Sequence, residues 1–269
     1  MIKNKKGILI LIVSFIALYL IINIIYIIPK GKKYKNTVFL GSSTKVSINK
    51  GTISVYNEDK QLRKQNVKVY FKNKIVDGTI SSEKVPSSGV INSYYVQDLN
   101  NFDLYYDKAL IAYTPDISID IKNDKSYTSK DLTTLYEFAN SNSIDISDIV
   151  EIIQQNVTTV DIDEDDNDEY IYSISLVETY GLDDDSEEIS EEYYTVVFLK
   201  NEGKYYLIDS EVGDYDEISN TQLSFVKLID FNNDGDYEFV IKKQMTEYGP
   251  YYYELYNFDG NEFTKIGGE

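Results

Sequence analysis

Two short acidic segments carry most of the chemistry that this sequence offers. The first runs from Asp161 to Glu169 and the second from Asp230 to Glu238, and both follow the pattern D-x-[D/N]-x-D-x-[D/N]-x-E. Ca²⁺ takes about six to eight oxygen ligands from carboxylates, amide side chains and backbone carbonyls. Side-chain oxygens at positions 1, 3, 5 and 9, with the backbone carbonyl of position 7, can surround one such ion. The candidate ligands are Asp161, Asp163, Asp165, Asn167 and Glu169 in the first loop, and Asp230, Asn232, Asp234, Asp236 and Glu238 in the second.

The two loops differ at position 6, where the chain must turn sharply and φ is expected to be positive. Gly235 occupies this position in the second loop, and glycine adopts positive φ without steric cost. Asp166 occupies it in the first loop and tolerates that conformation less well. The first loop has more carboxylates to attract a cation, but these also repel one another in the empty site. We therefore predict that the second loop binds Ca²⁺ more tightly than the first.

An EF-hand does not explain these loops. An EF-hand needs flanking helices and a bidentate glutamate at position 12. That position holds Tyr172 in the first loop and Ile241 in the second, and both residues lie in segments with strand character.

The loops belong to an internal repeat. Residues 157–171 (VTTVDIDEDDNDEYI) align with residues 226–240 (VKLIDFNNDGDYEFV), and the apolar positions keep the same register. Strand-like segments follow each loop, with the Gly-containing hairpin turns NEGK and FDGN at corresponding places. The pattern predicts strand, acidic loop, strand, turn, strand, tight glycine turn and strand in both copies. The acidic stretch 183–192 of the first copy is expected to be a solvated loop.

This spacing resembles the calcium loops of FG-GAP or VCBS-type repeats, which form the blades of integrin-like β-propellers. In that family a D-x-D-x-D-G-x-x-D loop connects the first two strands of a blade. The resemblance covers roughly residues 157–266 and rests on Asp230, Asn232, Asp234, Gly235 and Glu238, with glutamate at position 9 in place of the family's aspartate. It implies two blade-like, four-stranded repeats. Propellers close with about four to eight blades, so we do not expect a complete propeller.

The composition excludes several classes of function. The chain has 269 residues, no His and no Cys, so a Ser-His-Asp triad, a thiol nucleophile and the usual zinc sites are absent. The net charge of −19 argues against a nucleic-acid partner. We therefore expect no enzyme. A glycosidase acting through two carboxylates about 5–10 Å apart is the enzymatic alternative, although no distinguishing motif supports it.

The N-terminal segment predicts a membrane anchor. Residues 7–28 form an uncharged apolar stretch, roughly 33 Å long as a helix and enough to cross a hydrocarbon core of about 30 Å. It is longer than the apolar part of a signal peptide and has no small-residue cleavage site, which favours an uncleaved signal-anchor. Lysines flank both sides, so the charge bias is nearly balanced. We expect a single-pass protein of the cell membrane with its C-terminal region extracellular. The composition resembles that of a Gram-positive bacterium.

The remainder reads as mainly β. After the anchor and its basic flanks (1–35), a β-rich region (36–127) contains strand-like segments at 44–50, 52–57, 66–73, 92–96, 109–115 and 116–123, with apparent turns at 57–61 and 73–78. A helical connector (128–155) follows. Helical spacing predicts one helix after Thr128 and a second from Ile146 to Gln154. The two repeats occupy 156–269.

These features predict a membrane-anchored extracellular binding or accessory protein whose repeats are stabilised by Ca²⁺. Its partner outside the cell would be a protein or a carbohydrate. The alternative is a tethered sensor, or an assembly partner whose membrane helix pairs with another membrane protein through Asn23.

Overall fold

The protein is mainly β in the computed structural model, which describes residues 33–41, 43–56, 62–71, 74–84, 92–97, 111–144, 149–181, 189–214, 221–244 and 251–267. Within these residues the chain forms three antiparallel sheets and one short helix. The predicted membrane segment at 7–28 lies outside the described residues, and no helix among those described has the length and apolarity to cross a membrane.

The first sheet has the strand order β3-β2-β1-β7-β4-β5-β6. Its strands are β1 (Thr37–Leu40), β2 (Thr44–Asn49), β3 (Thr52–Tyr56), β4 (Gln65–Phe71), β5 (Lys74–Lys84), β6 (Asn92–Gln97) and β7 (Ile111–Tyr113). The sequence predicted most of these strands but missed β1 and β5. The predicted turn at 73–78 is wrong for residues 74–78. These residues pair with β4 from Phe71↔Lys74 to Val67↔Gly78, so the Asp77-Gly78 turn signal lies inside a ladder.

The two predicted repeats each form a meander of four strands, as expected from their sequence. The second sheet has the order β13-β12-β11-β10-β9 and the third has the order β17-β16-β15-β14-β8. The strands of the second sheet are β9 (Lys125–Thr128), β10 (Ile149–Val160), β11 (Glu169–Gly181), β12 (Ile189–Asn201) and β13 (Lys204–Asp214). Those of the third are β8 (Asp120–Ile121), β14 (Gln222–Asp230), β15 (Glu238–Gln244), β16 (Tyr251–Phe258) and β17 (Phe263–Ile266).

Each repeat sheet gains a fifth strand from the segment that precedes the helix. β8 pairs with β14 of the second repeat, and β9 pairs with β10 of the first. Residues 189–192, which we expected in a solvated loop, instead belong to β12. The hairpin turn between β12 and β13 has Glu202 at φ 47° and Gly203 at φ 76°, the combination that a two-residue type I′ turn requires.

One of the two predicted helices is present. Helix α2 (Thr133–Asn142) begins after Leu132, and Thr128, the expected start, is the last residue of β9. The second predicted helix is wrong, because residues 149–154 belong to β10 and pair with β11; residues 145–148 lie outside the described part. β10 has irregularities between Ile149 and Glu151 and between Ile152 and Gln154. These shifts interrupt the strict alternation, so its isoleucines imitate helical spacing.

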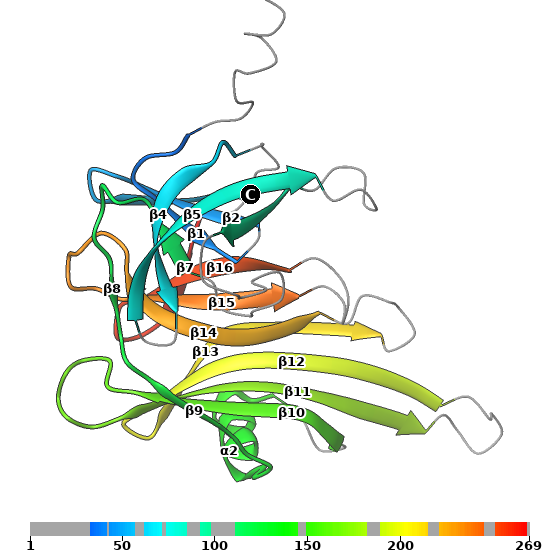
Figure 1. Ribbon diagram of the computed structural model, residues 1–269. Coiled ribbons are helices and arrows are strands. Elements are labelled where there is room, and N and C mark those ends of the chain that lie inside the picture. The colour runs from blue at the N-terminus through cyan, green and yellow to red at the C-terminus, as the bar shows by residue number, and fades with distance from the viewer. Residues whose placement is uncertain are drawn as a thin grey trace, which may run out of the picture.

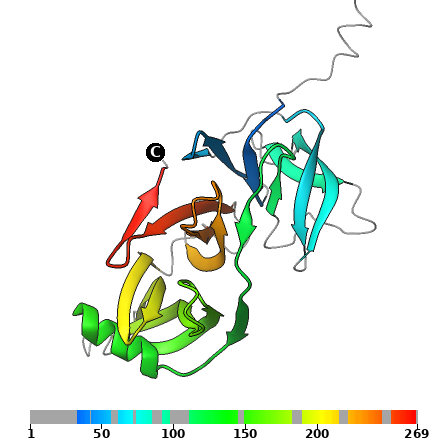
Figure 2. The ribbon, with the colours of Figure 1, turned by 90° about the vertical axis from the view of Figure 1, so that its left-hand side faces the viewer.

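Apolar side chains fill the space between successive sheets. One core, which includes Val38, Val46, Phe231 and Tyr253, lies between the first and third sheets. Another joins the second and third sheets. Figure 1 shows the resulting order of layers: first sheet, third sheet, second sheet and α2. In Figure 2 the third sheet, in orange and red, again lies between the other two.

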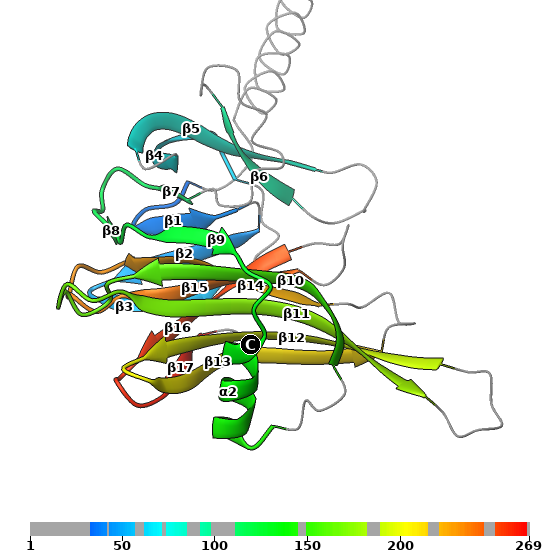
Figure 3. The ribbon, with the colours of Figure 1, turned by 90° about the horizontal axis from the view of Figure 1, so that it is seen from below.

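Helix α2 covers the outer face of the second sheet (Figure 3). Leu135 and Phe138 are buried, and the Phe138 ring stacks on Phe198 with ring centroids 4.1 Å apart. The second sheet is therefore packed on both faces, which holds its β10–β11 connection on a rigid support.

Candidate metal centre

The two acidic loops occupy equivalent places in the two repeat sheets. The first loop connects β10 to β11, and the second connects β14 to β15. In each loop the position-9 glutamate begins the second strand, where Glu169 pairs with Val160 and Glu238 pairs with Ile229. Both ends of each loop are thus fixed by a β ladder.

The backbone follows the same path through both loops. Positions 4 and 6 have positive φ in each: Glu164 at 65° and Asp166 at 68° in the first loop, Asn233 at 58° and Gly235 at 94° in the second. The positive φ at position 6 confirms the turn that the sequence predicted there. The left-handed residue at position 4 was not predicted, because glutamate gives no signal for this conformation, although asparagine does.

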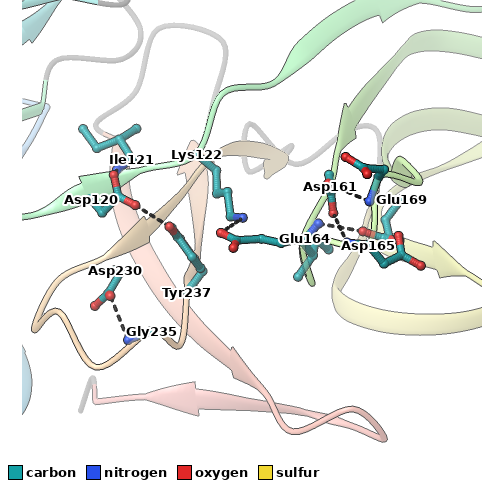
Figure 4. Close-up of polar contacts among 12 residues, drawn as sticks. Asp120, Ile121, Lys122, Asp161, Glu164, Asp165, Glu169, Asp230, Gly235 and Tyr237 are labelled. Atoms are coloured by element: carbon teal, nitrogen blue, oxygen red, sulfur yellow. Dashed lines mark hydrogen bonds and ion pairs between the residues drawn. The ribbon is translucent and has the colours of Figure 1, made fainter.

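The aspartate at position 1 organises each loop through backbone amides. Asp161 accepts the N–H groups of Asp165 and Asp166 at 3.2 Å each. In the second loop Asp230 Oδ2 accepts the Gly235 N–H at 2.9 Å, as Figure 4 shows, and its Oδ1 accepts the amide of Asp234 at 3.3 Å. The same carboxylate therefore bonds to the same two positions in both loops.

The glutamate at position 9 bonds to the backbone amide at position 2 in each loop. Glu169 Oε2 accepts the Ile162 N–H at 2.7 Å, and Glu238 Oε2 accepts the equivalent Phe231 N–H at 3.2 Å. Both glutamates are buried, with 5% and 4% of their surface exposed. A carboxylate at such depth requires compensating charge or hydrogen bonds, and backbone amides alone supply only part of it.

Positions 3, 5 and 7 lie toward solvent. Asp165 accepts the Asn167 N–H at 2.8 Å, and Asp234 accepts the Asp236 N–H at 3.0 Å, which again matches the two loops. Asn232 donates from Nδ2 to Asp234 Oδ2 at 2.7 Å and to the carbonyl of Gly51 at 3.0 Å. The second loop is therefore tied to the first sheet as well as to its own.

The first loop gathers three carboxylates at a spacing suited to one cation. Oxygens of Asp161, Asp163 and Glu169 all lie within 4.8 Å of one another. Ligand oxygens about 2.3–2.6 Å from a Ca²⁺ ion lie at most about 5 Å apart, so this set fits. The second loop has an amide, Asn232, at position 3. Its donors are thus the mixture of carboxylate, amide and backbone carbonyl oxygens that Ca²⁺ accepts.

Burial and like charges disfavour the ionised glutamates. Burial, together with the charges of Asp234 and Asp230, raises the pKa of Glu238 to about 7, although the amide of Phe231 opposes this rise. Burial likewise raises the pKa of Glu169 above its ordinary value. A bound divalent cation would favour the carboxylate form of both side chains.

Two residues before the helix, Asp120 and Lys122, contact the loops, and sequence reasoning did not identify them as site residues (Figure 4). Lys122 forms an ion pair with Glu164 of the first loop at 2.8 Å, and its ammonium lies 4.8 Å from the Tyr237 ring centroid in the second. Tyr237 donates its hydroxyl to Asp120. The sequence predicted a strand over 116–123, but only Asp120 and Ile121 form one, by pairing with the end of β14. The prediction is therefore wrong for 116–119 and 122–123.

An open cleft of about 700 Å³ lies between the two loops. Its lining combines residues of both loops with residues of the β8 segment: Ser118, Ile119, Asp120, Ile162, Asp163, Glu164, Asp230, Asn233, Gly235 and Tyr237. The two candidate sites therefore face a common space.

No protein-family model, curated protein or solved structure matches the chain. The functional argument therefore depends on the geometry of the loops themselves.

Proposed function

We propose that this chain is a membrane-anchored extracellular binding or accessory protein whose two blade-like β repeats are stabilised by Ca²⁺. The observation that carries the proposal is the repeated loop geometry. Two segments 69 residues apart share positive φ at positions 4 and 6, the amide bonds to the position-1 aspartate and a buried glutamate at position 9. A solvated acidic turn has no need to keep all three features twice.

In each loop the residues at positions 1, 3, 5 and 9, with the position-7 carbonyl, would hold the ion. Bound Ca²⁺ would neutralise the buried glutamate and the surrounding aspartates. The loops would then hold the first two strands of each repeat at a fixed spacing and present a rigid cleft to a partner. An acidic ectodomain, in a chain of net charge −19, attracts such cations.

Calcium is expected to raise the thermal unfolding midpoint of the full chain in neutral detergent. A ligand that binds only the folded state adds about 2.7 kcal/mol at 100 times its Kd, which corresponds to about 5–10 °C for a protein near this size. Unfolding would be followed by circular dichroism in calcium and in chelator, with magnesium as the control cation. Coincident midpoints in calcium and chelator would refute the proposal.

The second loop is expected to bind Ca²⁺ more tightly than the first. Calorimetric titration of Asp161→Ala and Asp230→Ala variants separates the two sites, since each variant removes the aspartate that organises one loop. Loss of the tighter transition in Asp161→Ala, with Asp230→Ala unaffected, would reverse the ranking.

The conformation of position 6 is expected to set this ranking. Gly235→Ala should cost about 1–2 kcal/mol, or about tenfold in affinity, because φ is 94° there and the added Cβ meets no atom within 4 Å. Asp166→Gly is the reciprocal change and should strengthen the first loop. Each would be titrated in a background that lacks the other site. Equal affinities before and after both substitutions would show that the turn does not decide the ranking.

A further inference from the structure

A pocket of about 310 Å³ lies where the chain enters the first sheet. Its described lining consists of three lysines, two tyrosines, a threonine and a serine: Lys33, Tyr34, Lys35, Thr37, Lys45, Ser47 and Tyr56. None of these side chains is acidic, although the chain carries 45 acidic residues against 26 basic ones. The pocket thus concentrates positive charge and hydroxyl donors, the groups that bind phosphate.

The entry segment is fixed in place at Tyr34. The Tyr34 N–H donates to Gln65 Oε1 at 2.8 Å, and Gln65 Nε2 donates back to the Tyr34 carbonyl at 3.4 Å. The Tyr34 ring meets Phe39 edge-on, with centroids 6.0 Å apart. The carbonyl of Lys35, the next residue after Tyr34, accepts a hydrogen bond from Thr37 Oγ1 at 2.7 Å. Lys33 and Lys35 are therefore held at a defined place by the backbone that carries them.

Lys45 forms the inner wall of this pocket. It lies on β2 with 2% of its surface exposed, and its ammonium donates to the Tyr34 hydroxyl at 3.2 Å. The same ammonium lies 4.8 Å from the centroid of the Tyr34 ring. A strand thus presents one buried cation to the same space as two exposed lysines.

We propose that this pocket binds the phosphate of an anionic lipid headgroup. The proposal rests on the membrane attachment proposed above: the predicted anchor ends at residue 28, so the five residues to Lys33 span at most about 18 Å. Lysines next to an anionic surface attract its lipids, and tyrosines collect at headgroup depth. Tyr56, with 45% of its surface exposed, supplies such a ring beside the lysines.

The lipid contact also has a physical role for an ectodomain of this charge. An anionic membrane repels the acidic repeats, and three lysines at the point of entry counter that repulsion locally. The headgroup would then fix the first sheet close to the membrane, and the two loops of the repeats would remain available to a partner.

The test uses the full chain in neutral detergent, titrated calorimetrically with dihexanoyl phosphatidylglycerol. Dihexanoyl phosphatidylcholine and inorganic phosphate are the parallel probes. We expect saturable binding of phosphatidylglycerol and at least tenfold weaker binding of the other two. The variant Lys33→Gln/Lys35→Gln should lose about 25-fold in affinity, at about fivefold for each lysine near an anionic surface. Both side chains are exposed, and the attraction of Lys35 to Asp116 is screened by solvent, so the thermal unfolding midpoint should change little.

The matched control is Lys50→Gln/Lys74→Gln, which removes the same charge from two exposed lysines outside the pocket. It should bind phosphatidylglycerol like the unmodified chain. Equal weakening in the control would overturn the proposal in favour of a general charge effect, and equally tight inorganic phosphate would overturn the lipid assignment. Absence of phosphatidylglycerol binding would also overturn it. None of these outcomes depends on Ca²⁺ or on whether the anchor spans a membrane. Failure of the lipid proposal can therefore be told apart from failure of the proposed calcium-dependent function.

Discussion

In the calcium-free protein at pH 8, Glu238→Gln is expected to raise the free energy of unfolding by up to about 3 kcal/mol. The carboxylate is buried beneath the second loop, and its pKa is raised from 4.5 to about 7. One pKa unit corresponds to about 1.4 kcal/mol of difference between the two protonation states. Glutamine has the shape of the protonated acid and can still accept the Phe231 N–H, so it removes the cost of the buried charge.

The pH dependence follows from the sign of this shift. The folded protein holds the Glu238 proton at pH values where the unfolded chain has already released it. Stability therefore falls as pH rises from about 4.5 to about 7, and the penalty is complete above that range. The stabilising effect of Glu238→Gln should accordingly be absent at pH 4 and full at pH 8.

Calcium should reverse the effect of the same substitution. Bound Ca²⁺ would favour the ionised form of Glu238, which is one of its proposed ligands. Calcium should therefore raise the free energy of unfolding of the unmodified chain more than that of Glu238→Gln. Denaturant unfolding at pH 4 and pH 8, with calcium and with chelator, measures the effect of Glu238→Gln on the free energy of unfolding under each condition. Glu262→Gln, at an exposed position, is the control and should move neither. Destabilisation by Glu238→Gln in chelator at pH 8 would contradict the inference that the buried Glu238 charge is unfavourable.

The sequence predicted the parts of the fold that repeat or alternate. The 69-residue repeat placed β10 to β13 and β14 to β17 in matching order, since the same apolar register recurred around both loops. The candidate ligand positions were chosen from residue type and spacing, and they stay a prediction. The positive φ of Asp166 was predictable because Gly235 occupies the same place in the other copy.

Features set by tertiary pairing were not predictable. Residues 149–154, the first half of β10, were predicted as part of a helix because irregular pairing with β11 breaks the alternation of their isoleucines. The alternation over 116–123 predicted a longer strand, whereas only the two residues of β8 find a partner, pairing with Asp230 and Ile229. The bridge from Lys122 to Glu164 and Tyr237 depends on that pairing, so the sequence contains no local signal for it.

Hydroxyl side chains of one sheet bond to the backbone of the next sheet. The Phe225 N–H on β14 donates to Ser173 of the second sheet at 2.9 Å. The Tyr253 N–H on β16 donates to Thr44 of the first sheet at 2.9 Å, and Ser43 donates to the Tyr251 carbonyl at 2.6 Å. These bonds link successive sheets through backbone groups as well as through apolar packing, so we expect the sheets to unfold as one unit.

Gly41→Ala is expected to destabilise the protein by about 2–5 kcal/mol, because Gly41 lies where the first and third sheets meet. Its φ is 55°, which costs a non-glycine residue about 1–2 kcal/mol. A Cβ there would also lie 2.5 Å from Tyr253 Cε2 and 2.9 Å from Tyr251 Cε2. Tyr253 is 1% exposed and has no room to move away, so overpacking adds about 1–3 kcal/mol.

Gly203→Ala separates the two contributions to this effect. Gly203 has φ of 76° in the β12–β13 turn, but an added Cβ would meet no atom within 4 Å, so only the backbone cost of about 1–2 kcal/mol applies. Denaturant unfolding of both variants, with tyrosine fluorescence and far-ultraviolet circular dichroism as probes, gives the difference. If the sheets form one unit, Gly41→Ala should shift both probes together. Equal effects of the two alanines would show that contact with Tyr253 and Tyr251 adds no cost. A Gly41→Ala transition that separates by probe would show that the first sheet and the repeats fold independently.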